Sequence, residues 1–151
     1  MWAYYALNHQ GFVIGFDHNH PYFHTNGLRD LWDVKKVEYS CRRPARTLVN
    51  SHEIDNIFTK SLYWKNEKEY RIIKMLSLAD SVIPIREGYP VCLFKFPPEA
   101  VKEVVLGEKI DAVTIKNLKK ALQNECWENI KILKAESDEK RFKLNFKKYD
   151  L

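Results

Sequence analysis

The chain has 151 residues, 45% of them apolar and 13% aromatic, which is enough to build a folded core of ordinary domain size. Lys and Arg number 25 against 20 Asp and Glu, so charge balance and apolar content exclude an intrinsically disordered chain. No apolar run is long enough to span a bilayer, and the opening MWAYYALNHQ has no basic region followed by an apolar one, which argues against export and membrane insertion. The three cysteines, Cys41, Cys92 and Cys126, are too few and too far apart for a disulfide framework, so we expect reduced thiols in a cytoplasm.

The first half of the chain opens with a dense aromatic segment. Gly11 can end a helical turn over 4–8, because glycine adopts the left-handed conformation at little cost. The five residues over 12–16 then have strand composition. The other predicted elements of this half are a loop over 18–32 with a short helical piece, a strand over 34–39, a helix over 54–61 and a connector over 63–69.

The second half has clearer periodicity. Ile115, Leu118 and Leu122 recur at spacings of three and four opposite a lysine-rich face, which predicts an amphipathic helix over 110–123. Apolar and polar residues alternate over 141–146, the period of a half-buried strand. The other predicted elements are a strand over 70–76, a loop over 79–90, a buried strand over 91–96 ended by two prolines, a strand over 101–106 closed by Gly107, and an extended segment over 130–133.

The order of these elements indicates the fold class. Strands outnumber helices and do not alternate regularly with them, which favours an α+β fold with a mixed, mostly antiparallel sheet and two to four helices. The sequence contains no internal repeat, low-complexity tract or linker, so we expect a single domain over 1–151.

Two carboxylates, Glu67 and Glu69, stand two residues apart at the entry to a predicted strand. In an extended backbone both point to one side, and like charges held close raise the pKa of at least one of them, which suits acid–base or transition-state chemistry. Trp64 can wall such a site, and Arg71 shares the strand parity of the two glutamates. The alternative is a solvated surface on which neighbouring cations pair with the glutamates. These cations are Lys60, Lys65, Lys68 and Arg71.

Histidines near the start of the chain offer a candidate metal site. His18, His20 and His24 follow Asp17 closely, and imidazole with carboxylate at short spacing can bind a transition metal. A hydrophilic loop with unliganded histidines is the alternative, and it is favoured because His-x-His on an irregular loop beside Pro21 is a weak pattern. His9 precedes Gly11 at the end of the first helical turn, where an imidazole can cap the last carbonyls.

One stretch carries five basic residues against a single acidic one, Glu38. The basic residues are Lys35, Lys36, Arg42, Arg43 and Arg46. Clustered Lys and Arg supply affinity for nucleic acid, so a nucleic-acid partner is a candidate. A metal-dependent nuclease using Asp17, Asp33 and Lys35 is a further alternative, because two acids and a lysine can surround a divalent ion.

Three segments combine uncommon residues at fixed offsets. The first holds Met1-Trp2, Tyr5-Ala6, His9, Gly11-Phe12 and Ile14-Gly15-Phe16-Asp17. The second holds Phe58, Lys60-Ser61, Trp64, Glu67, Glu69 and Arg71, and the third runs from Phe96-Pro97-Pro98-Glu99-Ala100 to Val104-Val105-Leu106-Gly107. In order and spacing they resemble the bacterial family catalogued as domain of unknown function 2971. Tyr70 departs from the pattern, since the family often has tryptophan there.

The resemblance implies a bacterial cytoplasmic protein of a kind found near phage-defence and mobile-element genes. It also implies a further N-terminal portion in relatives, to which nothing here corresponds. We therefore expect an exposed apolar face near Trp2, Tyr5 and Phe12. Trp2, Tyr5 and His9 are candidate substrate-binding or site-shaping residues.

The segment Glu67-Lys68-Glu69 also resembles the Glu-x-Glu motif of ADP-ribosyltransferases. There the second glutamate stabilises an oxocarbenium-like ribose as nicotinamide leaves, and the first orients the acceptor. The resemblance implies NAD as substrate, Glu69 and Glu67 as catalytic residues, and a partial ADP-ribosyltransferase-like fold. Other signatures of that superfamily, an early NAD-gripping residue and a Ser-Thr-Ser strand, are not visible. The main alternative is a non-catalytic binding module in which Trp64, Glu67, Glu69 and Arg71 form a structural network.

Overall fold

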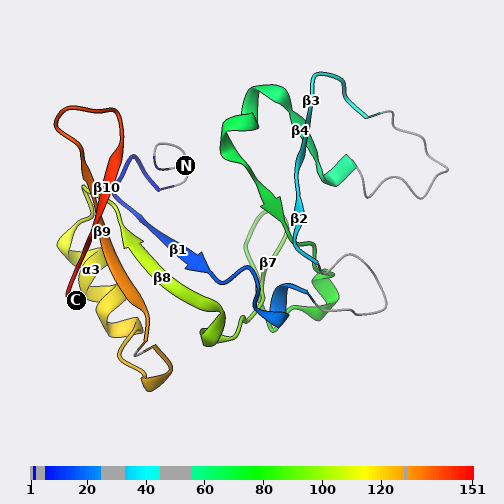
Figure 1. The fold of residues 1–151 in the computed structure, drawn as a ribbon. Coiled ribbons are helices and arrows are strands. Elements are labelled where there is room, and N and C mark those ends of the chain that lie inside the picture. The colour runs from blue at the N-terminus through cyan, green and yellow to red at the C-terminus, as the bar shows by residue number, and fades with distance from the viewer. Residues whose placement is uncertain (1, 3–5, 25–32, 45–55, 128) are drawn as a thin grey trace. The chain divides into compact units, whose positions relative to one another are not determined.

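The computed structural model describes residues 2, 6–24, 33–44, 56–127 and 129–151, and they fall into two compact units (Figure 1). Unit 1 comprises Met1–His18 and Phe96–Leu151, and unit 2 comprises Asn19–Lys95. The single domain expected over 1–151 stays a prediction. Among the described residues, no helix has the length and apolar content needed to cross a membrane.

A four-stranded sheet in the order β1-β8-β9-β10 forms unit 1. Its strands are β1 (Phe12–Phe16), β8 (Val101–Leu106), β9 (Lys131–Ser137) and β10 (Leu144–Lys148). β8 runs antiparallel to β1 and parallel to β9, and β9 and β10 form an antiparallel hairpin. The strands predicted over 12–16 and 101–106 are confirmed, and the extended segment predicted over 130–133 is the beginning of the longer β9.

The helix α3 (Ala112–Ala121) links the parallel strands β8 and β9, as a parallel pair requires. Asp111 caps its start, because the carboxylate accepts a hydrogen bond from the Thr114 N–H at 2.8 Å. The predicted amphipathic helix is confirmed, with Leu118 buried against Val104 and Leu106. The partly buried residues around this cluster are Ile110, Leu122, Ile130, Ile132, Tyr149 and Leu151.

The opposite face of the sheet buries a second apolar cluster. Val105, Leu133 and Ala135 are buried there, with Trp2 and Leu144 packed against them. Consecutive strand residues point to opposite faces, so β8 contributes to both clusters by alternation. Two short 3-10 helices complete unit 1, η5 (Pro98–Ala100) and η6 (Glu125–Trp127).

Two sequence predictions at the ends of these strands have different outcomes. Gly107 follows β8 as expected, and a Cβ there would lie only 2.1 Å from the His9 carbonyl oxygen, so only glycine fits. The strand predicted over 141–146 is wrong at its start, because Phe142 lies in the turn before β10 and is fully exposed. The alternation of apolar and polar residues therefore extends into the turn before β10, where Phe142 is not buried.

The described part of unit 2 contains short strands in three separate pairs. β2 (Lys35–Lys36) pairs antiparallel with β5 (Tyr70–Arg71), β3 (Glu38–Ser40) pairs parallel with β4 (Thr59–Ser61), and β6 (Ser81–Ile83) pairs antiparallel with β7 (Val91–Leu93). Among the described residues, the 3-10 helices of this unit are η1 (Pro21–Phe23), η3 (Leu62–Glu67) and η4 (Leu76–Leu78). Val37 and Phe58 are its buried apolar side chains among the described residues.

The sequence misplaced several elements of unit 2. The strand predicted over 34–39 is divided at Val37 into β2 and β3, which pair with different partners. The helix predicted over 54–61 is wrong at its end, since 59–61 form β4, while 54 and 55 lie outside the described residues. The connector predicted over 63–69 contains the 3-10 helix η3. In each case a partner far along the chain, or a tight turn, determines the conformation.

The segment from 70 to 96 also differs from its prediction. The strand predicted over 70–76 is reduced to Tyr70 and Arg71, and the loop predicted over 79–90 contains β6. The strand predicted as buried over 91–96 is β7, whose apolar residues Val91 and Leu93 are exposed. The apolar composition therefore predicted the strand correctly but its burial wrongly.

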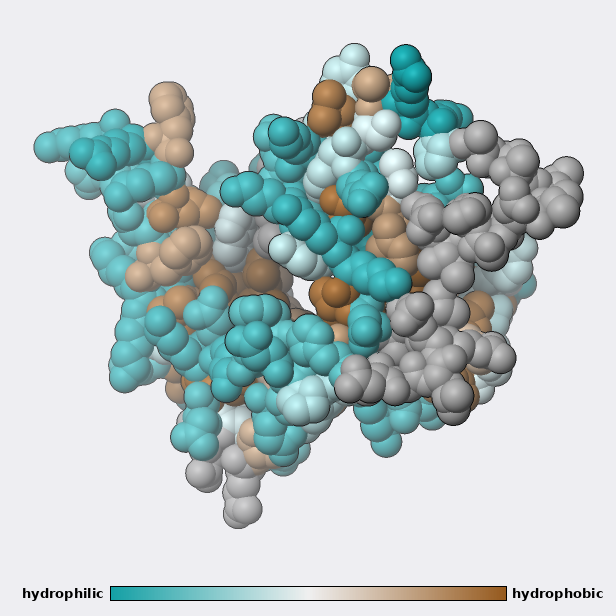
Figure 2. All heavy atoms as spheres, turned by 45° about the vertical axis from the view of Figure 1, so that its right-hand side comes forward, coloured by the Kyte–Doolittle hydropathy of each residue, from teal (hydrophilic) through white to brown (hydrophobic). Residues whose placement is uncertain are grey.

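The α+β class and the predominance of antiparallel pairing are confirmed, because four of the six described strand pairings are antiparallel. The strands form several small sheets rather than one. In the view of Figure 2, hydrophilic side chains cover most of the surface and apolar side chains show between them.

Candidate functional site

Four charged side chains of unit 2 meet in one place, here called the polar cluster: Lys60, Glu67, Glu69 and Arg71. Lys60 comes from β4, Glu67 ends η3, and Arg71 lies on β5. Lys68 adopts a left-handed conformation with φ of 49°, which ends η3 and turns the chain into β5. The turn lets both glutamates reach the same lysine.

Glu67 and Glu69 point toward the same partner, but the backbone conformation that brings them together differs from the predicted one. The sequence argument assumed an extended backbone over 67–69, but Glu67 is helical and Lys68 is left-handed. The prediction that the carboxylates lie together is confirmed by their common partner, the Lys60 ammonium group. The backbone geometry behind that prediction is wrong.

Arg71 grips Glu69 with two parallel hydrogen bonds. Its Nε donates to Oε1 at 2.6 Å and its Nη2 donates to Oε2 at 3.1 Å. Its remaining Nη1 donates to the carbonyl of Ile57. Such a planar fork fixes the direction of a carboxylate as well as its charge. Arg71 therefore orients Glu69.

Lys60, on β4, completes the polar cluster. Its Nζ donates to Oε2 of Glu69 at 2.9 Å and to the carboxylate of Glu67. The same Nζ stands 5.3 Å from the centre of the Trp64 ring, a cation–π contact. Trp64 is 44% exposed, so the predicted aromatic wall stands beside the polar cluster with part of its ring open to solvent.

The backbone of Glu69 is held from both sides. Its N–H donates to the Tyr39 hydroxyl at 2.8 Å, and its carbonyl accepts from the Val37 N–H at 2.9 Å. Tyr39 lies on β3 and pairs in register with Lys60 on β4. The parallel pair β3–β4 thus supplies both a backbone clamp and the cluster's lysine.

These contacts set the protonation states. The Arg71 hydrogen bonds, helped by Lys60 and opposed by partial burial, lower the pKa of Glu69 to about 2. Hydrogen bonds to Glu67 and then to Glu69 raise the pKa of Lys60, and Glu69 raises the pKa of Arg71. Like charges were expected to raise the pKa of at least one of the two carboxyls; at Glu69 the hydrogen bonds of Arg71 and Lys60 outweigh partial burial and the pKa is lowered instead. Glu69 is therefore an ion near neutral pH and cannot serve there as a proton donor.

The alternative of simple charge pairing is confirmed in part. Lys60 and Arg71 pair with the glutamates, but all four side chains are partly buried rather than fully solvated. Lys65 and Lys68 are exposed. A pair held in a bidentate fork with partial burial is more ordered than a typical surface ion pair.

The other predicted site residues lie in unit 1. The ring of Trp2 stacks on that of His9, with centroids 5.7 Å apart and planes 6° from parallel. His9 has a backbone φ of 71° and its buried Nδ1 has no hydrogen-bond partner, while the predicted capping of a carbonyl stays a prediction. Phe12 is 39% exposed, in line with the predicted apolar face, whereas Tyr5 lies outside the described residues.

The candidate metal ligands do not form a cluster. Among the residues that the structure describes, no group of three or more His, Cys, Asp or Glu side chains is arranged to hold a metal ion. His20 instead caps η1, where its Nδ1 accepts from the Tyr22 N–H at 3.2 Å. Asp17 pairs with Lys102 at 3.3 Å in unit 1.

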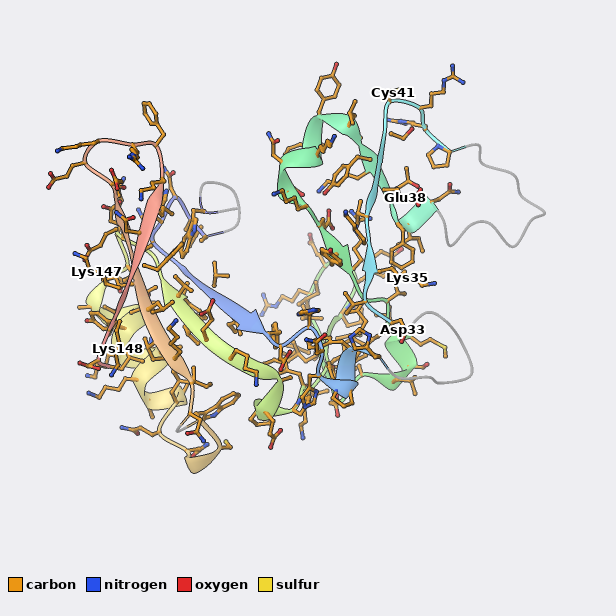
Figure 3. All side chains as sticks on the ribbon, in the orientation of Figure 1. Asp33, Lys35, Glu38, Cys41, Lys147 and Lys148 are labelled. Carbon is orange, nitrogen blue, oxygen red and sulfur yellow. The ribbon has the colours of Figure 1, made fainter. Side chains whose placement is uncertain are left out.

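The candidate nuclease residues are divided between the units, since Asp17 belongs to unit 1, and Asp33 and Lys35 belong to unit 2. Figure 3 shows Asp33 and Lys35 close together at the entry to β2, with Cys41 beyond the far end of β3. One buried oxygen of Asp33 has no hydrogen-bond partner, and Lys35 stands 5.7 Å from the centre of the Phe58 ring.

The predicted basic cluster extends over two elements. Lys35 and Lys36 form β2 and line a shallow cavity of about 330 Å³, while Arg42 and Arg43 follow β3 and are exposed. Arg46 lies outside the described residues. A nucleic-acid partner at these residues stays a prediction.

Sequence reasoning missed two residues of the site. Tyr39 was not singled out, and Lys60 was considered only as one of several neutralising cations. Both act through the pairing of β3 with β4, whose strands are some twenty residues apart in sequence and carry no pattern that reveals a parallel pair. The position of Tyr39, an aromatic residue within a basic stretch, was the sequence feature that could have singled it out.

The site and fold together define the class: a mixed α+β protein with two partly buried carboxylates held by a lysine and an arginine. Residues 1–72 match the model of the family described as "Protein of unknown function (DUF2971)". The resemblance drawn from the first two sequence segments is thereby confirmed, and the matched range contains the whole polar cluster with Tyr39 and Trp64. No curated protein and no solved structure matches the chain.

Proposed function

We propose that the polar cluster is the carboxylate centre of an NAD-using transferase or NAD-cleaving enzyme of the ADP-ribosyltransferase type, with Glu69 as the central carboxylate and Glu67 as its accessory. One observation carries the proposal. Glu69 is held as an oriented anion by Arg71 and Lys60, yet 26% of its side chain stays exposed. The proposal includes a partial ADP-ribosyltransferase-like fold and a role as a bacterial cytoplasmic effector in phage defence or stress response.

The chemistry requires a fixed negative charge. When the bond between ribose C1′ and nicotinamide breaks, the bonding electrons leave with nicotinamide and positive charge develops on the ribose. A preorganised carboxylate stabilises that charge without reorganising at the moment of reaction. The new bond to C1′ forms from water or another nucleophile, which gives up its proton. A carboxyl group whose pKa is about 2 carries the required charge throughout the physiological pH range.

The surroundings of Glu69 support positioning roles. Arg71 and the Tyr39 hydroxyl fix the side chain and backbone of Glu69, so both are positioning residues. The exposed part of the Trp64 ring offers a flat surface beside the polar cluster, and aromatic faces stack well on the ring systems of NAD.

A second candidate, from another class, is a non-catalytic binding module in which the polar cluster is structural. One observation favours it: both oxygens of Glu69 accept hydrogen bonds from cations, so its charge is largely neutralised within the chain. In that case the cluster ties β4, η3 and β5 together and serves a partner site rather than a reaction.

Nicotinamide release from NAD by the full chain separates the two candidates. The proposal predicts release by the wild type, and a loss of about 100-fold or more in Glu69→Gln at a temperature well below the thermal midpoint of the variant, so that the lost ion pairs do not account for it. Glu87→Gln, at an exposed position of the same unit, is the matched control and keeps full activity. A wild type that releases no nicotinamide, or a Glu69→Gln variant that retains the rate, contradicts the enzyme. A large fall in thermal midpoint without any activity to lose supports the structural module.

A further inference from the structure

The two edges of the sheet in unit 1 differ in charge. β10 forms one edge and ends in Lys147 and Lys148, both strongly exposed (Figure 3). Charged side chains on an edge strand oppose pairing with another sheet. β1 forms the other edge, and its sequence Phe-Val-Ile-Gly-Phe contains no charged residue and no proline. Only one edge therefore carries charges that resist pairing.

The apolar side chains of β1 continue past the region that α3 covers. Phe12 lies opposite Leu106 and Ile14 opposite Val104, and residues opposite one another share a face of the sheet. Leu106 and Val104 are buried with Leu118 of α3, whereas Phe12 and Ile14 are 39% and 38% exposed. Phe16 follows a register irregularity and lies opposite Val101, and the alternation along β1 itself places it with Phe12 and Ile14. Phe96 packs edge-on against Phe16 with ring centroids 5.1 Å apart, and these four side chains are here called the β1 row.

The backbone of β1 offers hydrogen bonds along the same edge. The Gly107 N–H donates to the Gly11 carbonyl at 2.9 Å, so the pair one step before Phe12 and Leu106 is hydrogen-bonded. Antiparallel pairs alternate between hydrogen-bonded and non-hydrogen-bonded, so the amide and carbonyl groups of Phe12 and Ile14 point away from β8. Among the described residues, β1 has a paired strand on one side only.

We infer that β1 is a self-association edge, at which a second copy of this chain pairs antiparallel across a two-fold axis at Ile14. The apolar pattern Phe-x-Ile-x-Phe reads the same in both directions, so this axis sets Ile14 opposite its own copy and Phe12 opposite Phe16 of the second copy. The outward backbone groups of Ile14 then form a reciprocal hydrogen-bonded pair. No charges meet along the five residues, and the two β1 rows continue one another.

The available area indicates a weak complex. Four side chains, each roughly 40% exposed, expose on the order of 300 Å² per copy, of which edge pairing covers only a part, against about 800 Å² per partner in a standard stable interface. We therefore expect a reversible dimer with a dissociation constant in about the micromolar range or above, and not a permanent one.

Sedimentation velocity of the full chain at increasing concentration tests the association. The wild type is expected to shift from monomer to dimer over about 10–500 µM, and Ile14→Lys, which sets two ammonium groups opposite each other, to weaken the dimer about tenfold or more. Val82→Lys, at an exposed apolar position of β6, is the matched control and leaves the association unchanged. A wild type that stays monomeric over this range, or a dimer equally weakened by Val82→Lys, overturns the inference.

Cross-linking tests the register without depending on a destabilising charge. Opposite residues of a hydrogen-bonded antiparallel pair lie about 5.5 Å apart at Cα, within disulfide reach, so Ile14→Cys is expected to yield an oxidised dimer linked at position 14. Phe12→Cys is the control, because the two copies of position 12 lie about 14 Å apart in this register. The wild type, run alongside, gives the background from Cys41, Cys92 and Cys126. Equal linkage through both variants, or none through Ile14→Cys, contradicts the two-fold arrangement.

Discussion

In unit 1, both faces of a four-stranded sheet bury apolar side chains and α3 covers one of them, whereas unit 2 sets strands of two or three residues around two carboxylates and two cations. The first arrangement depends on apolar area removed from water, which varies little with pH or salt. The second depends on charge pairing, which varies with both. The two units should therefore respond to different perturbations, and each prediction below probes that difference.

The largest expected effect is in the core of unit 1. Leu106 is fully buried between β8 and α3, so Leu106→Ala should lower the free energy of unfolding by about 2–5 kcal/mol. Denaturant unfolding measures the loss. Leu76→Ala, at a leucine of unit 2 that is 69% exposed, should change it by less than about 0.5 kcal/mol. Equal effects at the two positions would contradict the assigned core.

A smaller loss is expected from the polar cluster. Arg71→Ala removes the fork on Glu69 and leaves that carboxylate with Lys60 alone, which should cost about 1 kcal/mol after allowing for solvent screening of a partly exposed pair. Thermal unfolding followed by tryptophan fluorescence is a suitable readout. Arg86→Ala, at an exposed arginine of the same unit, should have no measurable effect, and a matching loss there would argue against the fork.

Acid should weaken unit 2 through Glu69. Its pKa falls from an ordinary 4.5 to about 2 on folding, so its contribution is complete above pH 4.5 and is lost as the pH falls toward 2. Unfolding free energies measured between pH 6 and pH 2 should therefore fall less steeply in Glu69→Gln than in the wild type. Parallel curves for the two proteins would mean that Glu69 is not held as an ion.

Salt should give the smallest effect. At about 1 M salt the screening length falls to about 3 Å, so the stability difference between the wild type and Arg71→Ala should shrink. The difference between the wild type and Leu106→Ala should stay the same, because apolar packing carries no charge. A salt response of equal size in both variants would remove the contrast between the units.

The sequence predicted the elements of unit 1 better than those of unit 2 for a physical reason. β1, β8 and α3 each carry their pattern locally: a short apolar run, a second run closed by Gly107, and apolar residues at helical spacing. In unit 2, Thr59–Ser61 reads as helix but forms β4, because its conformation depends on pairing with β3 some twenty residues earlier. Pairings of that kind leave no periodic trace.

The sequence predicted most of the residues of the candidate site, but not how they contact one another. The spacing of Glu67, Glu69 and Arg71, with Trp64 nearby, was sufficient to single out the segment. The left-handed turn at Lys68 and the clamp from Tyr39 were not visible, and they decide which cation faces which carboxylate. The direction of the Glu69 pKa shift follows from its contacts with Arg71 and Lys60, which the spacing of the two glutamates did not reveal.

An NMR titration of the Glu69 side-chain carboxyl tests the central claim, that Arg71 and Lys60 hold this group as a permanent ion. The wild type should titrate with a midpoint near 2, and Arg71→Ala should move that midpoint toward the ordinary 4.5. A wild-type midpoint near 4.5, unchanged in Arg71→Ala, would contradict the polar cluster and both functions proposed for it.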